Sequence, residues 1–338
     1  MGAALLIGSG GAPASAQSRT DLILQRFRDV KNWAGHVMVV AHRGGGLQHG
    51  KTRFAENSRA AVRDAIGLGA DMVEIDVRAS RDGVFVVMHD SWLDRTTTCR
   101  GEVADFDLAG LKRCKLKIEG TGVATGETVP TLAEILALTR GRILVNIDNK
   151  LETTDLPAMV EVARSLGVAR EVVIKQNLWN EARVAETRAV LDEIGDEAVF
   201  MPIVADDAVR DAAMAEAMVG GFRPPALELI VWHRDGAPMT PDGGPLFSAA
   251  MREAARRGNW RLWVNTYPII NRPPGLVAGG RGDDLALRDP EAAWGFWLER
   301  GATIIQTDEP DRAIAYLKGR GLRMPYEAPD EATVVAGH

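Results

Sequence analysis

Nine short apolar runs, rich in β-branched residues and separated mostly by helix-like segments, constrain the fold of this chain more than any other feature. They lie at 37–41, 72–77, 84–88, 142–147, 171–174, 199–204, 226–231, 261–265 and 302–306. Most are continuously apolar, a pattern typical of strands that are buried on both faces of a parallel sheet covered by helices. The sequence therefore predicts an α/β fold, a (β/α)8 barrel if one of the nine runs is exceptional.

The exceptional run lies near residues 77–88. The strand ending at Val77 and the one starting at Val84 are too close in sequence for a helical crossover, and Asp82-Gly83 between them is a turn dipeptide. We therefore expect one irregular, extra or antiparallel strand there.

Two helix starts support the strand–loop–helix order. Thr131 and Glu134 have the spacing of a capping box. Asp308, followed by Glu309-Pro310, has the composition of an N-cap with proline in the first turn. Both predictions place a loop between a strand and the next helix.

A single barrel domain is expected over 17–322, because no linker or internal repeat interrupts this region. Residues 323–338 carry prolines and acidic residues and are expected to wrap the surface or be disordered. Residues 1–16 have no charge and end in Ala14-Ser15-Ala16, which resembles a signal-peptidase site without the usual basic start. They are either the remnant of an export signal or a disordered tail.

Export would place the protein in the periplasm or outside the cell, and the alternative is the cytoplasm. An oxidising compartment would permit a disulfide between Cys99 and Cys114, the only two cysteines. Sequence alone does not establish that these residues lie close enough to pair.

The net charge of the chain limits the kinds of partner that it is expected to bind. The net charge is −6, and no basic block occurs, which argues against nucleic acid or an anionic membrane surface as the main partner. No later run has the length of a membrane span, so stable membrane insertion is not expected. A small-molecule partner is favoured, and the sequence does not indicate an oligomeric state.

Polar residues interrupt four apolar runs near their C-terminal ends. They are His42-Arg43, Glu74 with Asp76, His89-Asp90, and the alternating set Asn146, Asp148 and Lys150. In a barrel, the C-terminal ends of all strands meet at one mouth. Glu74, Asp76 and Asp148 would then offer three oxygen ligands, a set that suits one divalent cation, Ca²⁺ or Mg²⁺.

The remaining polar residues suit chemistry on a phosphate ester. His42 and His89 could act as acid and base, while Arg43 and Lys150 could neutralise a phosphoryl group. Each residue alone also has a structural interpretation: Asp90, for example, could cap a helix. Their joint occurrence favours a functional site.

Six segments of the chain match one family pattern. They are "AHRG", "ENS" at 56–58, "GADMVEIDVRASRDGVFVVMHDSWLDRTT", "PTLAEIL", "NIDNK" and "QTDEPD". Together they resemble the bacterial metal-dependent glycerophosphodiester phosphodiesterases, which have a TIM barrel of the phospholipase C-like type. The resemblance implies cleavage of a glycerophosphodiester to glycerol 3-phosphate and an alcohol.

The resemblance also implies roles for individual residues. His42 and His89 would be the acid–base pair, Arg43 and Lys150 phosphate contacts, and Glu74 and Asp76 metal ligands. Glu56 would sit beside the metal or the substrate.

This chain departs from the family pattern in three places. Asp148 stands where a glutamate is usual, and the loop 44–55 lacks a proline before the Glu-Asn pair. In the strand "RLWVNTY", the spacing between tryptophan and asparagine differs from that of the family. Trp263 and Asn265 are therefore candidates for substrate contact, without a role that the family pattern assigns.

Two other functions remain open. Related barrels cleave lipid headgroup phosphodiesters as phospholipases D or C, and an apolar rim at the mouth, drawn from tryptophans such as Trp92, Trp179, Trp232 and Trp260, would favour that activity. The other alternative is a non-catalytic barrel that binds a phosphorylated ligand. The sequence does not decide the alcohol, the cation, which histidine is the acid, or whether a cyclic intermediate forms.

Overall fold

The computed structural model of the chain describes residues 17–234, 236–268 and 277–326. The predictions for residues 1–16, and for most of the segment 323–338, therefore lie outside the described residues.

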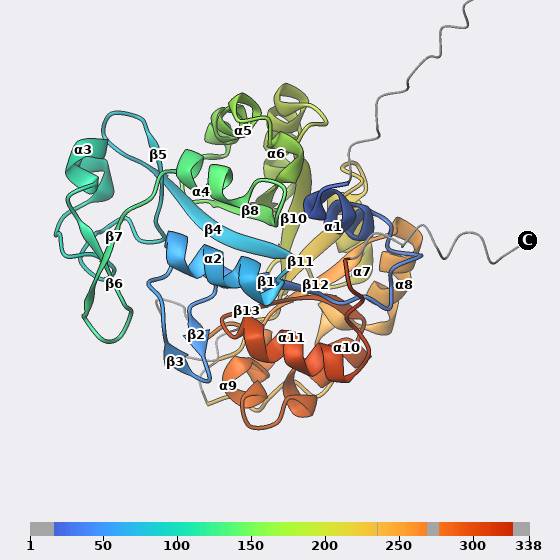
Figure 1. The fold of residues 1–338 in the computed structure, drawn as a ribbon. Coiled ribbons are helices and arrows are strands. Elements are labelled where there is room, and N and C mark those ends of the chain that lie inside the picture. The colour runs from blue at the N-terminus through green and yellow to red at the C-terminus, as the bar shows by residue number, and fades with distance from the viewer. Residues whose placement is uncertain (1–16, 235, 269–276, 327–338) are drawn as a thin grey trace, which may run out of the picture.

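Eight parallel strands form a closed barrel (Figure 1). In barrel order they are β1 (Met38–Ala41), β4 (Met72–Ala79), β8 (Leu144–Asn149), β9 (Val172–Asn177), β10 (Val199–Ala205), β11 (Ala226–Ile230), β12 (Arg261–Asn265) and β13 (Ala302–Thr307). The barrel closes because β1 pairs with β13 on one side and with β4 on the other. This confirms the predicted (β/α)8 fold.

The ninth run forms β5 (Phe85–Val87), which is antiparallel to the outer end of β4. Val77 pairs with Val87 and Ala79 with Phe85, while Gly83 adopts a left-handed φ of 78° in the turn between them. The extra strand is therefore a hairpin that leads the chain back toward the barrel mouth at His89.

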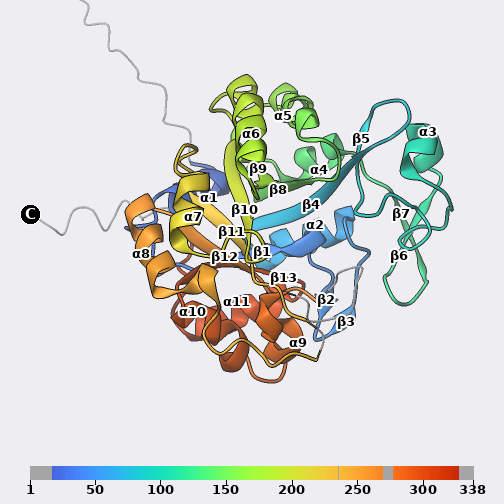
Figure 2. The ribbon, with the colours of Figure 1, turned by 180° about the vertical axis from the view of Figure 1, so that it is seen from behind.

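Helices cover most of the outside of the barrel in both views, and one short helix, α3 (Leu108–Leu111), lies apart from it (Figures 1 and 2). They are α1 (Arg19–Arg28), α2 (Arg59–Leu68), α3 (Leu108–Leu111), α4 (Leu132–Thr139), α5 (Leu156–Ser165), α6 (Glu181–Ile194), α7 (Ala212–Val219), α8 (Ala249–Gly258), α9 (Asp283–Ala286), α10 (Phe296–Glu299) and α11 (Pro310–Gly319). None of the described helices is long and apolar enough to cross a lipid bilayer.

One of the two predicted helix starts is confirmed and the other is wrong. Thr131 and Glu134 form the expected capping box of α4. The N-cap of α11 is Glu309, without a side-chain cap, and Asp308 does not cap it. Instead, the carboxylate of Asp308 lies beside His42, because the chain before α11 turns toward the mouth.

The barrel interior divides into an apolar lower layer and a polar upper layer. Apolar side chains from the starts of the strands fill the lower layer, among them Met38, Met72, Leu144, Val173 and Trp263, and α1 packs beneath them with Ile23 and Phe27. The interior positions nearer the C-terminal ends of the strands carry many of the buried polar residues, among them Glu74, Asp76 and Lys175. A second group of buried polar residues, which includes His36, Asp71 and Arg261, lies at the opposite end of the barrel, near the starts of the strands.

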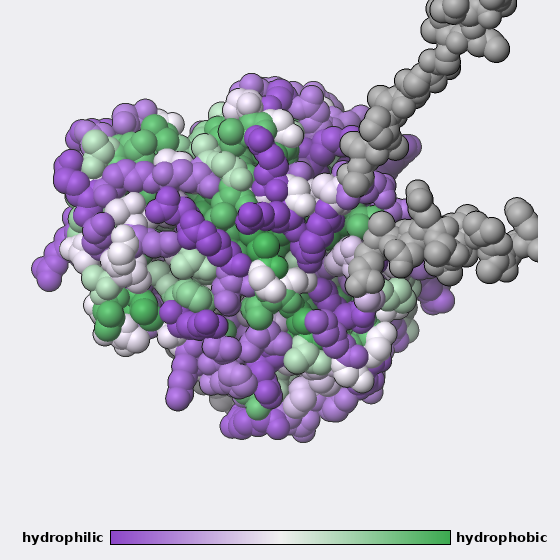
Figure 3. All heavy atoms as spheres, in the orientation of Figure 1, coloured by the Kyte–Doolittle hydropathy of each residue, from purple (hydrophilic) through white to green (hydrophobic). Residues whose placement is uncertain are grey.

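An insertion between β5 and α4 forms a separate lobe with its own apolar cluster. It contains the hairpin of β6 (Lys115–Lys117) and β7 (Ala124–Thr128), and a second small hairpin, β2 (Leu47–Gln48) with β3 (Lys51–Thr52), follows β1. Figure 3 shows a largely hydrophilic face with apolar patches, one of them over this lobe. Within the lobe, Cys99 and Cys114 form a disulfide, with Cα atoms 5.4 Å apart.

Candidate active site

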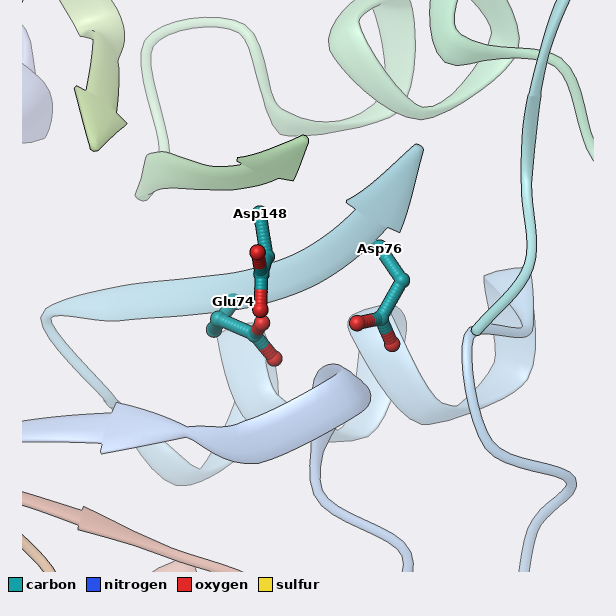
Figure 4. Close-up of side chains that lie close together, drawn as sticks. All are labelled: Glu74, Asp76 and Asp148. Carbon is teal, nitrogen blue, oxygen red and sulfur yellow. The ribbon is translucent and has the colours of Figure 1, made fainter. Parts of the chain in front are cut away.

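Three carboxylates from two neighbouring strands meet inside the barrel mouth (Figure 4). Glu74 and Asp76 lie two residues apart on β4 and therefore share a face, and Asp148 on β8 is in register with Asp76. One ligand oxygen from each residue lies within 4.8 Å of the others. The structure thus brings together the three acidic residues that the sequence proposed as metal ligands.

The electrostatics of this cluster fit a bound cation. Burial, and the neighbouring charges of Asp76 and Asp148, raise the pKa of Glu74 to about 8. Burial would also raise the pKa of Asp76, but Lys150 and Arg43 hold that pKa well below its usual value. Three carboxylates without nitrogen or sulfur ligands form the donor set that Ca²⁺ and Mg²⁺ prefer.

Two lysines approach the carboxylates from neighbouring strands. The Nζ atom of Lys150, just after β8, lies 3.0 Å from Oδ1 of Asp76 and 2.8 Å from Oδ2 of Asp148. Lys175 on β9 is buried, with its Nζ atom 3.2 Å from Glu228 and 3.6 Å from Glu74. Sequence reasoning missed Lys175, although a lysine directly after the apolar run 171–174 was a usable signal.

Arg43 is buried and held from several sides. Its backbone has a left-handed φ of 53°, which a non-glycine residue rarely adopts. Its N–H donates to Glu74 at 3.0 Å, and its Nη1 donates to both oxygens of Glu56 at 3.1 Å. Such backbone conformations persist where surrounding contacts hold them in place, as these do here.

Glu56 connects this region to the lobe. Besides Arg43 it accepts hydrogen bonds from Arg95, which also donates to Asp90 and Glu119. The next residue, Asn57, donates from Nδ2 to Asp76 at 2.7 Å. The Glu-Asn pair thus positions an arginine and a carboxylate, and sequence reasoning missed Arg95.

His42 lies buried against an aromatic ring and a carboxylate. Its Nδ1 atom is 2.9 Å from Oδ1 of Asp308, and its ring stacks on Tyr267 with centroids 3.6 Å apart. Burial, with help from the charge of Arg43, lowers the pKa of His42 well below its usual value. Donation of the Nδ1 proton to Asp308 leaves Nε2 as a hydrogen-bond acceptor.

His89 has a similar partner. Its Nδ1 atom lies 2.7 Å from Oδ1 of Asp90, and Asp90 in turn accepts from Arg95. Asp90 does not begin a helix, so its structural interpretation as an N-cap is wrong. Both imidazoles therefore have a carboxylate at Nδ1.

Trp263 and Asn265 lie deeper. Trp263 is completely buried, and its indole N–H donates to Asn265 at 2.8 Å and to Gln306 at 3.0 Å. Asn265 donates in turn to Glu228 at 2.8 Å, and Glu228 is the partner of Lys175. These contacts make the two residues a support for the buried lysine, and direct contact with substrate stays a prediction.

Comparisons with known proteins identify a family whose members resemble this chain. The model of the glycerophosphoryl diester phosphodiesterase family matches residues 42–238, and a model of a domain of unknown function matches residues 200–317. A glycerophosphodiester phosphodiesterase of Caldanaerobacter subterraneus is 38% identical over 126 residues, 37% of this chain and 50% of that protein. One of Bacillus altitudinis is 35% identical over 128 residues, 36% of this chain and 49% of that protein. The matched part thus spans about half the length of these relatives.

Solved structures share the fold over most of their length. A glycerophosphoryl diester phosphodiesterase from Parabacteroides distasonis superposes with a TM-score of 0.65 at 19% identity, covering 93% of this chain and 95% of that one. A glycerophosphodiester phosphodiesterase from Agrobacterium tumefaciens has a TM-score of 0.57 at 25% identity, covering 82% and 99%. An Oleispira antarctica phosphodiesterase, solved with the product sn-glycerol-3-phosphate, has a TM-score of 0.56 at 20% identity, covering 83% and 96%.

Proposed function

This chain belongs to the glycerophosphoryl diester phosphodiesterase family, and on that premise we propose that it hydrolyses glycerophosphodiesters to glycerol 3-phosphate and an alcohol. One observation carries the proposal: a three-carboxylate cluster and two imidazoles with carboxylate partners belong to the same barrel mouth. Such a set combines a cation site with groups that can move protons.

The cation would be held by Glu74, Asp76 and Asp148. Bound Ca²⁺ or Mg²⁺ would supply Lewis-acid stabilisation of the phosphoryl oxygens. Arg43 and Lys150 add positive charge beside the same carboxylates, where charge builds up during cleavage. Glu56 keeps the guanidinium of Arg43 in place through its two hydrogen bonds.

His42 is the better candidate for the base. Its lowered pKa keeps it neutral near pH 7, and the contact with Asp308 orients its Nε2 atom as an acceptor. His89 then donates a proton to the leaving alkoxide, with Asp90 and Arg95 holding its ring. Each proton transfer contributes about 10²–10⁴-fold.

We also propose that the protein is exported to the periplasm or beyond. The Cys99–Cys114 disulfide supports this location, because disulfides persist in oxidising compartments. A non-catalytic binding barrel is disfavoured, because both histidines, the lysine and all three acidic positions carry competent side chains.

The test compares His42→Ala and His89→Ala with the wild type on glycerophosphocholine, with Ca²⁺ or Mg²⁺ present. Both variants should lose about 10²–10⁴-fold in kcat. An activated diester with a p-nitrophenol leaving group distinguishes the roles, because that group needs no acid. His89→Ala should then recover much of its rate and His42→Ala should not. His49→Ala, a change of an exposed residue, is the control. Full activity of either His42→Ala or His89→Ala on glycerophosphocholine would overturn the proposal.

A further inference from the structure

Lys175 is a buried lysine inside the barrel that the proposed mechanism does not use. It lies on β9, the strand next to β8, and its side chain is 3% exposed. Its Nζ atom donates to Oε2 of Glu228 at 3.2 Å and lies 3.6 Å from Oε1 of Glu74 and 3.7 Å from Oδ2 of Asp148. Carboxylates this close keep the buried ammonium charged. The ammonium therefore stands beside two of the three carboxylates that Figure 4 shows.

Glu228 anchors this ammonium from outside the proposed cation site. It lies on β11, and its side chain is also 3% exposed. Its Oε1 atom accepts from Nδ2 of Asn265 at 2.8 Å, and Asn265 accepts in turn from the indole N–H of Trp263. Because Glu228 is not one of the three carboxylates assigned to the cation, a cation bound there does not compete with Lys175 for it.

Stability alone does not account for this buried pair. Removing two charges from water is costly, and replacing a buried ion pair by apolar residues is often neutral or stabilising. An apolar side chain is tolerated nearby, since Ile203 on β10 is in register with Glu228 and is only partly buried. The pair therefore indicates a ligand for Lys175 rather than a role in packing.

Lys175 has donors left for such a ligand. An ammonium has three N–H donors, and within the described ranges Lys175 uses one of them, for Glu228. Its contacts with Glu74 and Asp148 are longer than hydrogen bonds. Lys150 differs, because it donates to Asp148 at 2.8 Å and lies 3.0 Å from Asp76, both of which belong to the proposed cation site.

The charge of this region fits an anionic ligand once Lys175 is included. Three carboxylates and one divalent cation together leave a net negative charge, which would repel a phosphate ester. The ammonium groups of Lys150 and Lys175 reverse that sign beside Asp148. Lysine binds phosphate as a point charge, without the planar geometry that arginine requires.

We propose that Lys175 is a second phosphate-binding lysine, which donates to a phosphoryl oxygen of the bound ester and is held in place by Glu228 and Asn265. This inference rests on the proposed function. It adds a substrate contact from β9, a strand that contains none of the six family segments quoted above.

The binding test measures the affinity for sn-glycerol 3-phosphate by calorimetry at saturating Ca²⁺ or Mg²⁺. Lys175→Met combined with Glu228→Gln removes the ion pair as a whole, so that neither charge stays buried without its partner. This double variant should bind about 10–100-fold more weakly, the range of one charged hydrogen bond. Glu228→Gln alone keeps the ammonium and should bind less than about fivefold more weakly. Lys318→Met, a change of an exposed residue in α11, is the control.

A second measurement separates the phosphate contact from cation binding. Melting temperature at increasing Ca²⁺ or Mg²⁺ should show that the double variant binds the cation at least as tightly as the wild type, because a positive charge beside the site is gone. Weaker cation binding would make the loss of phosphate affinity indirect and would overturn the inference. So would a wild type that does not bind glycerol 3-phosphate, unchanged affinity in the double variant, or an equal loss in Glu228→Gln alone.

Failure of the proposed function gives a different result. A wild type that binds glycerol 3-phosphate through Lys175, yet cleaves no glycerophosphodiester with Ca²⁺ or Mg²⁺ present, would support the phosphate contact and overturn the proposed hydrolysis.

Discussion

The Nδ1 atom of His42 lies 2.9 Å from Oδ1 of Asp308, although 266 residues separate them in the chain. β1, which precedes His42, and β13, which precedes Asp308, are neighbours in the closed barrel. The contact therefore exists only because the barrel closes. It also leaves Nε2 as the nitrogen that can accept a proton in the proposed reaction.

Asp308→Asn tests this contact. The carboxamide can donate to Nδ1, which would place the imidazole proton on Nε2 and remove the acceptor. We expect kcat on glycerophosphocholine to fall by about 10²-fold or more, with KM nearly unchanged. Asp284→Asn, a change of an exposed residue nearby, is the control. A variant with wild-type kcat would show that Asp308 does not orient the base.

Glu74→Gln separates cation binding from folding. Because the folded pKa of Glu74 is raised to about 8, the stability of the fold decreases as the pH rises from the unfolded pKa to about 8, and this loss persists at higher pH. Without a cation, the neutral amide should therefore be at least as stable as the wild type at pH 8. With Ca²⁺ or Mg²⁺ at one hundred times Kd, the wild type should gain about 2.7 kcal/mol and the variant much less.

Thermal unfolding with added cation and with chelator measures both effects. Asp207→Asn, on an exposed loop residue, should behave like the wild type in each condition. Equal stabilisation of wild type and Glu74→Gln by the cation would place the cation elsewhere.

The disulfide should stabilise the lobe. Cys99 and Cys114 are separated by 15 positions in the sequence, and for a loop of that size loop-closure entropy amounts to about 3 kcal/mol. Reduction, or the change of both residues to Ser, should lower the free energy of unfolding by about that amount. Denaturant unfolding with and without reductant measures it, and the double variant should not respond to reductant. A wild type insensitive to reductant would contradict this.

The strands and the acidic cluster could be predicted because each rests on local pattern. Continuous apolar runs mark buried strands, and a period of two places Glu74 and Asp76 on one face wherever that strand lies. Barrel topology then brings Asp148 beside them. No knowledge of side-chain packing was needed for these steps.

The residues that sequence reasoning missed depend on contacts between distant segments. Arg95 joins Glu56 to Glu119, and Tyr267 stacks on His42, but nothing local to either residue indicates its partner. The local sequence around Asp308 predicted a helix cap. This prediction was wrong, because the carboxylate of Asp308 contacts Nδ1 of His42 at the barrel mouth. Lys175 differs, since its position directly after the apolar run 171–174 was informative.

Asp71 is a buried carboxylate directly before β4, at the end of the barrel opposite the mouth. Its carboxylate is fully buried, accepts from the backbone N–H of Val39 at 2.6 Å, and contacts Arg323 and Tyr326, with His36 3.5 Å away. Residues 323–326 therefore pack against the barrel in the described part of the expected tail. Burial alone would raise the pKa of Asp71, but Arg323 and His36 hold it well below its usual value.

Because the folded pKa of Asp71 is depressed, its contribution to stability is present above the unfolded pKa of about 4 and is lost as the pH falls further. Asp71→Asn should cost about 3–5 kcal/mol at pH 7, since Arg323 would remain buried without its charged partner. The variant's stability should then decline less steeply than that of the wild type on acidification below pH 4. Denaturant unfolding across this range measures both, with exposed Asp196→Asn as the control. Parallel pH curves for Asp71→Asn and wild type would contradict the assignment, because only the loss of a depressed carboxyl changes the slope.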